Sequence, residues 1–219
     1  MISSTMTVTA SRRFPLVEAF LFSACVAWYI WQRQDYYQYS WIIFPVWLIA
    51  SFAWNKDTLR SLGWRTDNLW STAKRASVVF VPCALAILAT GLLLEGEQHT
   101  FYHVLLPSRF FGYMFFCLLQ QVGLNSLVTN RLLAATDNPL RVSLISGMFF
   151  ALLHWPNPVL VPLTFVGGAL MAWLFWKERN ILPLTVWQTI LGSLVWWAFP
   201  IAWHHSMRVG PGFYRFHGY

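Results

Sequence analysis

Long apolar runs without charge are the feature that most restricts what this chain can fold into. The stretch 77–94, SVVFVPCALAILATGLLL, contains no charged side chain. A helix of about 20 such residues crosses the hydrocarbon core of a bilayer, which is about 30 Å thick. Only 11% of the 219 residues are charged and 57% are hydrophobic, whereas soluble domains carry about 25% charged residues. The pattern predicts an all-α protein, a polytopic transmembrane helical bundle.

Apolar runs of this kind divide the chain into about seven expected spans. They lie near residues 14–32, 39–54, 76–95, 108–121, 139–155, 159–176 and 181–203. We interpret 1–60 as N-terminal anchor spans with a cytoplasmic loop, 61–203 as the intramembrane core and 204–219 as a short polar tail. Several runs are shorter than a full crossing, so tilting or local bilayer thinning is expected.

The charged residues indicate how the chain is oriented. Net charge is +7, but the basic residues sit in short loops, which the positive-inside rule explains better than nucleic-acid binding. The loop at 55–75 carries five basic and two acidic residues and is predicted to be cytoplasmic, whereas Glu95 and Glu97 are predicted to face outward. Arg12 and Arg13 then favour a cytoplasmic N-terminus. We expect an integral protein of a bacterial inner membrane, whose surroundings are lipid and which does not bind nucleic acid.

Polar side chains interrupt the fourth apolar run, CLLQQVGLNSLVTNRL. Gln121 and Asn125 share a helix face with Cys117, and Gln120 lies about 100° from that face. An amide left unpaired in an apolar medium costs roughly 2–7 kcal/mol, so these groups must be satisfied. Two interpretations are open: the amides join helices to one another, or they line a water-filled pocket.

Further polar residues follow in the fifth and seventh runs. Phe150 and His154 share a helix face in MFFALLHWPNPVL, and the prolines on either side of Asn157 end the helix. Gln188 is another amide in mid-span, and polar residues inside a membrane are candidates for function. The alternative interpretation of His154 is a residue at the membrane–water interface, where a lone histidine near the end of a span is more often found. His204 and His205 close the seventh run, where we expect solvation by water.

The order of these motifs resembles the CAAX-protease and bacteriocin-processing (Abi) family of intramembrane proteases. That family has EExxxR, then FxxxH, then HxxxN motifs on successive helices. Here Phe150–His154 matches FxxxH, QQVGLN at 120–125 stands where EExxxR would be, and QTILG at 188–192 stands where HxxxN would be. SLGWR at 61–65 is similar to the lead-in of the family core, and the resemblance covers about residues 61–203.

The resemblance implies an intramembrane endopeptidase that processes a membrane-embedded peptide or protein. By position it assigns catalytic roles to His154, Gln120, Gln121 and Gln188, and substrate-binding roles to Asn125, Phe150 and Asn157. We expect the three glutamines and His154 to converge in one cavity. Amide oxygens are poor zinc ligands and one secure histidine does not make a three-ligand site, so neither a metal nor a cofactor is predicted.

The departures from the family pattern leave three interpretations open. A carboxylate can accept a proton from water but a neutral amide cannot, and Glu178, the acidic residue nearest the core, is expected in a loop beside Lys177 and Arg179. The first interpretation is a divergent peptidase with a shifted site, using His154 and one of the histidines at 204–205. The second is an inactive relative that binds or retains a membrane peptide. The third is an assembly or transport subunit.

Overall fold

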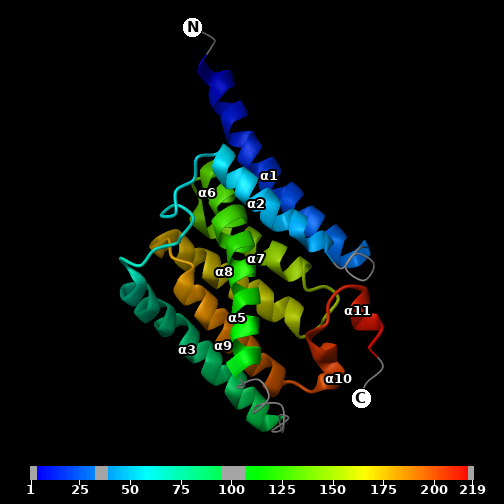
Figure 1. The fold of residues 1–219 in the computed structure, drawn as a ribbon. Helices are drawn as coiled ribbons and strands as arrows, with labels where there is room; N and C mark the ends of the chain where they lie inside the picture. Colours follow the sequence, from blue (N-terminus) through cyan, green and yellow to red (C-terminus); the bar gives the residue numbers. More distant parts are fainter. Residues whose placement is uncertain (1–3, 33–38, 95–106, 217–219) are drawn as a thin grey trace.

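The structure is a computed structural model that describes residues 4–32, 39–94 and 107–216. Within these ranges every regular element is a helix, which confirms the all-α prediction (Figure 1). The elements are α1 (Ser4–Gln32), η1 (Ser40–Ile42), α2 (Ile43–Trp54), α3 (Leu69–Leu93), α5 (Pro107–Gln121), η2 (Val122–Thr129), α6 (Asn130–Ala135), α7 (Pro139–Leu152), α8 (Leu160–Glu178), α9 (Leu182–Ala198), α10 (Ile201–His204), η3 (His205–Met207) and α11 (Pro211–Tyr214).

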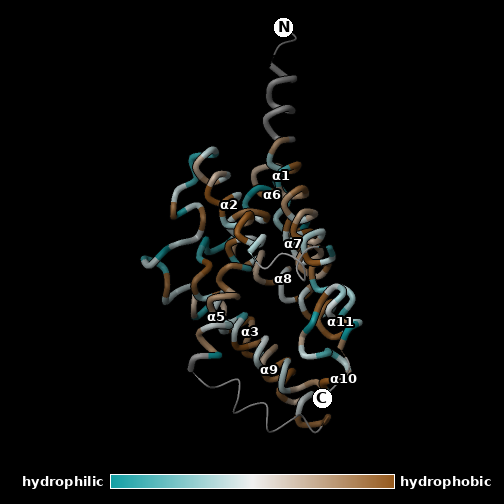
Figure 2. The backbone as a smooth tube through the Cα atoms, turned by 45° about the vertical axis from the view of Figure 1, so that its right-hand side comes forward, coloured by the Kyte–Doolittle hydropathy of each residue, from teal (hydrophilic) through white to brown (hydrophobic). Residues whose placement is uncertain are grey.

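Each of the seven expected apolar runs is helical, but the runs differ in whether they can cross a membrane. Among the described residues, four helices are long and apolar enough: Phe14–Gln32, Leu69–Leu93, Arg109–Ala135 and Leu160–Glu178. The last expected span is broken, because the chain bends by 119° between Leu182–Ala198 and Ile201–Met207. The 14-residue helix α7 rises about 21 Å, less than the roughly 30 Å of a bilayer core. Figure 2 shows hydrophobic residues on successive turns of the helices.

Two larger apolar cores, and a smaller cluster of Val159, Leu160 and Val195, hold the described part of the bundle together. The first joins α1, α2, the η2–α6 segment and α7, with Phe22, Leu127 and Leu132 among its buried residues. The second joins α3, α8 and α9 around Phe80 and Phe175. Val122 at the start of η2 packs against both, so this segment lies between them. Helices α7 and α8 approach closely because Gly147 has no side chain: a Cβ there would lie 2.5 Å from the carbonyl oxygen of Phe165.

The connecting segments that the structure describes gather at two ends of the bundle. At one end the loop after α2 contacts the α8–α9 turn through Arg65 and Asn180, and Arg179 donates to Asn130 of α6. At the other end the α7–α8 turn contacts the C-terminal segment, where the side-chain amide of Asn157 donates to the carbonyl of His204. The predicted outward glutamates at 95 and 97 lie outside the described residues, as do the side chains of the arginines at 12 and 13.

Candidate functional site

The helix that carries the paired glutamines is not a regular α-helix along its whole length. α5 continues into η2, a π-helical segment of eight residues, before α-helical geometry returns in α6. Within η2 the residues from Leu124 to Thr129 are all buried, because helices pack against more than one of its faces. The sequence pattern predicts a single stripe of buried polar residues on an α-helix and misses this wider turn. π-helical turns frequently occur at functional sites.

The amide side chains of this region form a continuous hydrogen-bonded chain between α5, η2 and α9. Gln188 of α9 donates from Nε2 to Gln120 Oε1 over 2.5 Å, and its own Oε1 accepts from Gln121 Nε2 over 2.6 Å. Gln121 Oε1 in turn accepts from Asn125 Nδ2 over 2.6 Å. The structure therefore brings together the three glutamines and Asn125, which sequence reasoning selected from two separate runs.

Hydroxyl groups extend the amide chain to α7. Thr129 Oγ1 lies 3.1 Å from Asn125 Oδ1 and 2.9 Å from the hydroxyl of Ser146. Gln121, Asn125, Thr129 and Ser146 are fully buried, whereas Gln120 at the opposite end is only half-buried. The structure describes no hydrogen bond from the amide nitrogen of Gln120. The chain thus joins helices, as one of the two sequence interpretations proposes, and reaches the surface of the bundle at Gln120.

His154 lies in the turn that follows α7. Its Nδ1 is 2.7 Å from the carbonyl oxygen of Phe150 and its ring packs edge-on against the Phe150 ring, with centroids 4.7 Å apart. Since a carbonyl only accepts, Nδ1 carries the proton and a neutral ring has its lone pair on Nε2. Among the described contacts, none joins His154 to the amide chain. Its catalytic role and those of the glutamines stay predictions.

Asn157, predicted to bind substrate, uses its full hydrogen-bonding capacity within the protein. Its Nδ2 donates to the carbonyls of His204 and Arg208 over 2.7 and 3.0 Å. Its Oδ1 accepts from the backbone N–H groups of Val159 and Leu160 at the start of α8. An amide offers two donors and two strong acceptor positions, so the folded state has none left for a ligand. Phe150 is also buried, against Gly168.

Of the two histidines for which solvation by water was expected, the structure buries His204 at the end of α10 and leaves His205 partly exposed. His204 is fully buried; its Nε2 donates to the carbonyl of Phe199 and its Nδ1 accepts from the N–H of Met207. The His205 ring stacks on Phe213 with centroids 4.0 Å apart. The expectation of full solvation is wrong for His204, because the bend after α9 turns this segment back against the α7–α8 turn.

The SLGWR loop braces the two elements that carry the amide chain. The Leu62 carbonyl accepts from the Ser126 hydroxyl of η2 over 2.5 Å, and the Gly63 carbonyl accepts from the N–H of Ile181 over 3.0 Å. Gly63 has a φ of +85°, and a Cβ on it would lie 2.7 Å from the Phe175 ring. Because only glycine adopts this backbone conformation beside a side chain without strain, the residue is needed for the brace.

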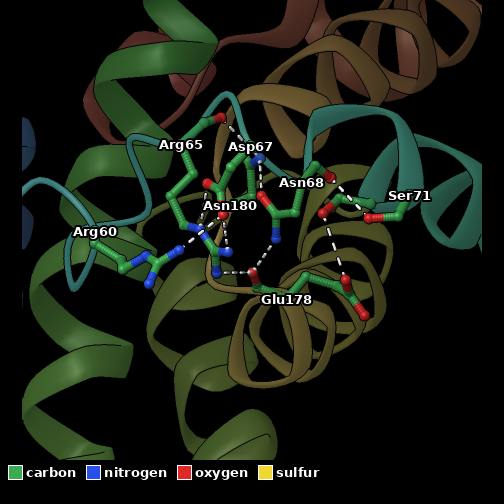
Figure 3. A network of polar contacts seen from close by, with 8 residues as sticks. Arg60, Arg65, Asp67, Asn68, Ser71, Glu178 and Asn180 are labelled. Carbon is green, nitrogen blue, oxygen red and sulfur yellow. Dashed lines mark hydrogen bonds and ion pairs between the residues drawn. The ribbon is translucent and has the colours of Figure 1, made fainter.

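A polar network next to this loop fixes the end of α8 (Figure 3). Arg65 donates to the carbonyl of Glu178, and Asn68 donates to the same oxygen over 2.7 Å. The side chain of Glu178 is buried and pairs with Arg75. The expectation that Glu178 lies in a loop is therefore wrong: it is the last residue of α8. Hydrogen bonds from Arg65, supported by Arg60, hold the pKa of the Asp67 carboxyl well below its usual range.

A second charged cluster was missed at the sequence level. Arg131 of α6 donates from Nε to Glu18 of α1 and from its terminal nitrogen to Asp57, each over 2.7 Å. The same guanidinium donates to the Ser51 hydroxyl of α2 over 3.0 Å, and Ser51 pairs with Glu18. All of these groups are buried or nearly so. The available signal was a carboxylate inside the apolar run FPLVEAFLF, since an intramembrane charge needs a partner.

Comparison with known protein families finds a match to part of this chain. The family model described as "Type II CAAX prenyl endopeptidase Rce1-like" matches residues 103–194, a range that contains the three glutamines and His154. No curated protein matches the chain, and no solved structure does. Within the described residues, no three histidine, cysteine or acidic side chains gather in a group that could hold a metal ion.

Proposed function

Residues 103–194 of this integral membrane protein match the model of the Rce1-like, type II CAAX prenyl endopeptidase family, and we propose that the chain belongs to this family and binds a membrane-embedded peptide without hydrolysing it. The substrate class follows from the family description: a prenylated peptide with a CAAX-type C-terminus. The proposal includes the location expected from the charge pattern, a bacterial inner membrane with a cytoplasmic N-terminus.

The observation that carries the proposal is the amide chain, whose inner members form their hydrogen bonds with one another. Gln121 and Gln188 donate to and accept from neighbouring amides, so their hydrogen bonds are made within the protein. No ionisable group joins this chain among the described side chains. General-base catalysis needs a group that accepts a proton near neutral pH, and a carboxamide does not. The arrangement supports a site that retains shape and polarity but does not activate water.

Gln120 is the residue that we propose contacts the peptide. Its Oε1 is occupied by Gln188, while its amide nitrogen is available at the half-buried end of the chain. Backbone carbonyls of a peptide in lipid lack water partners, so a donor at this position stabilises the bound peptide. Asn125 and Asn157 were predicted to bind substrate, but internal hydrogen bonds occupy both side chains. We therefore assign peptide binding to Gln120 instead.

The test uses the full chain in lipid nanodiscs and a farnesylated peptide that ends in a CAAX sequence. Photocrosslinking measures binding, and mass spectrometry of the peptide measures cleavage. We expect saturable binding without cleavage. Gln120→Ala should weaken binding about three- to tenfold, since one neutral hydrogen bond contributes roughly 0.5–1.5 kcal/mol. Ser71→Ala, at an exposed position on α3, is the control. Cleavage by the wild type that His154→Ala abolishes would refute the proposal.

Peptide hydrolysis is the second candidate, favoured by the orientation of His154. With Nδ1 held by the Phe150 carbonyl, Nε2 is the ring atom that would act as a base. The double variant Gln120→Glu/Gln121→Glu restores carboxylates at the two positions where the family has glutamates. Cleavage gained in this variant and lost on adding His154→Ala would support an active-site outline that lacks only its base.

A further inference from the structure

The buried cluster around Arg131 connects two parts of the molecule. Its two carboxylates and its hydroxyl come from the N-terminal α1–α2 hairpin, by which we mean α1, α2 and the residues after α2 up to Asp57. Glu18 lies on α1, Ser51 on α2, and Asp57 is tied to α2 by the bond from its N–H to the Phe52 carbonyl. Its cation comes from α6, which directly continues the η2 segment. Every interaction that Arg131 makes in this cluster therefore crosses from the hairpin to the bundle.

The hairpin also covers the π-helical segment. The Phe22 side chain of α1 lies over Gly123, where a Cβ would be 3.5 Å from the Phe22 ring. Ala19 and Phe22 belong to the same buried core as Leu127 and Val128 of η2. In Figure 1 α1 and α2 run together along one side of the bundle, next to α6. A membrane peptide that reaches this side of η2 has to displace the hairpin.

The charges of the cluster limit what can replace the hairpin. If α1 and α2 moved away alone, Arg131 would lose its carboxylate partners inside a bundle surrounded by lipid, which is strongly unfavourable. An incoming ligand that brings its own carboxylate removes this cost for Arg131, because the guanidinium binds a carboxylate in two parallel hydrogen bonds. A peptide with a free C-terminal carboxylate supplies the group that Arg131 needs.

We propose that the α1–α2 hairpin is a gate over η2, held closed by Glu18 and Asp57 on Arg131 and opened when the C-terminal carboxylate of a membrane peptide takes their place. The inference rests on the proposed peptide-binding function, and it adds the route of entry and the group that is recognised. Arg131 is a binding residue in the open state and a latch in the closed state.

Double electron–electron resonance in nanodiscs measures the gate directly. One spin-label pair joins Ile49 on α2 to Leu140 on α7; a reference pair within the bundle joins Val78 on α3 to Val186 on α9. All four positions are exposed. Glu18→Gln should raise the population with the longer hairpin–bundle distance about tenfold, equivalent to about 1.4 kcal/mol. The reference distance should not change. Asp67→Asn removes a carboxylate outside the cluster and should leave both distances unchanged.

The peptide experiment compares one farnesylated CAAX peptide as the free acid and as the C-terminal amide. The free acid should open the hairpin and the amide should not. An unchanged hairpin distance in Glu18→Gln, or a reference pair that broadens with it, would overturn the gate. Binding of both peptides without opening would refute the gate and leave the proposed function standing. Opening in Glu18→Gln with no binding of either peptide would refute the proposed function and carboxylate recognition, leaving only the hairpin latch.

Discussion

Replacement of Gln121 by leucine tests whether the amide chain is a network that stabilises the bundle. Gln121 is fully buried and lies at the centre of the chain, donating to Gln188 and accepting from Asn125. The substitution leaves Gln188 Oε1 and Asn125 Nδ2 without these partners. A buried group that loses its partner costs about 1–3 kcal/mol in general, but interhelical hydrogen bonds in membranes average only about 0.6 kcal/mol. We therefore expect Gln121→Leu to lower the free energy of unfolding by about 2 kcal/mol.

The assay is reversible unfolding in bicelles, with Gln120→Leu as the matched comparison. Gln120 makes one of the chain's hydrogen bonds whereas Gln121 makes two, so the loss of Gln120 should cost about 1 kcal/mol or less. A double-mutant cycle between positions 121 and 188 should give a coupling of about 0.5–2 kcal/mol. A Gln121→Leu protein within about 0.5 kcal/mol of wild type, without coupling, would refute the network.

Three further predictions concern the brace, the surface charges and the C-terminal segment. Gly63→Ala should destabilise the fold by about 1–3 kcal/mol because of its positive φ and its contact with the Phe175 ring; Gly167→Ala, which meets nothing within 4 Å, should be neutral or slightly stabilising. The pKa of Asp67 is lowered in the folded state, so its contribution to stability is present above the unfolded pKa of about 4 and is lost as pH falls through the folded value. The difference in melting temperature between wild type and Asp67→Asn should therefore be constant from pH 8 to 5 and shrink under stronger acid; a pH-independent difference would contradict this. Asn157→Asp keeps the acceptor at the start of α8 but loses the donors to the His204 and Arg208 carbonyls, so trypsin should cleave faster after Arg208; unchanged cleavage would show that the amide does not hold this segment.

The positions of the helices and the identity of the polar stripe could be predicted because both depend on local pattern. Apolar runs long enough to cross a bilayer indicate helices wherever they occur. Gln121, Asn125 and Cys117 repeat every four residues, and all three are buried as that spacing predicts. The ordered motifs from QQVGLN to QTILG also pointed to the family whose model matches residues 103–194.

Local pattern does not determine which helix faces meet. The bond between Gln120 and Gln188 joins residues 68 positions apart, and that between Arg131 and Glu18 joins residues 113 positions apart. Helical periodicity assigns each residue to a face of its own helix but carries no information about the neighbour of that face. The same limit explains Glu178, which two adjacent basic residues made resemble a loop residue, although α3 supplies its partner Arg75.

The sequence by itself therefore determined that this chain is a helical membrane protein with amides where the family that it resembles has an acid pair, because composition and spacing act within one segment at a time. Tertiary structure decided that those amides satisfy one another, that η2 widens into π-helical turns between two cores, and that a buried arginine ties the N-terminal hairpin to the bundle. These outcomes depend on polar groups in an apolar medium finding partners wherever the fold brings them close.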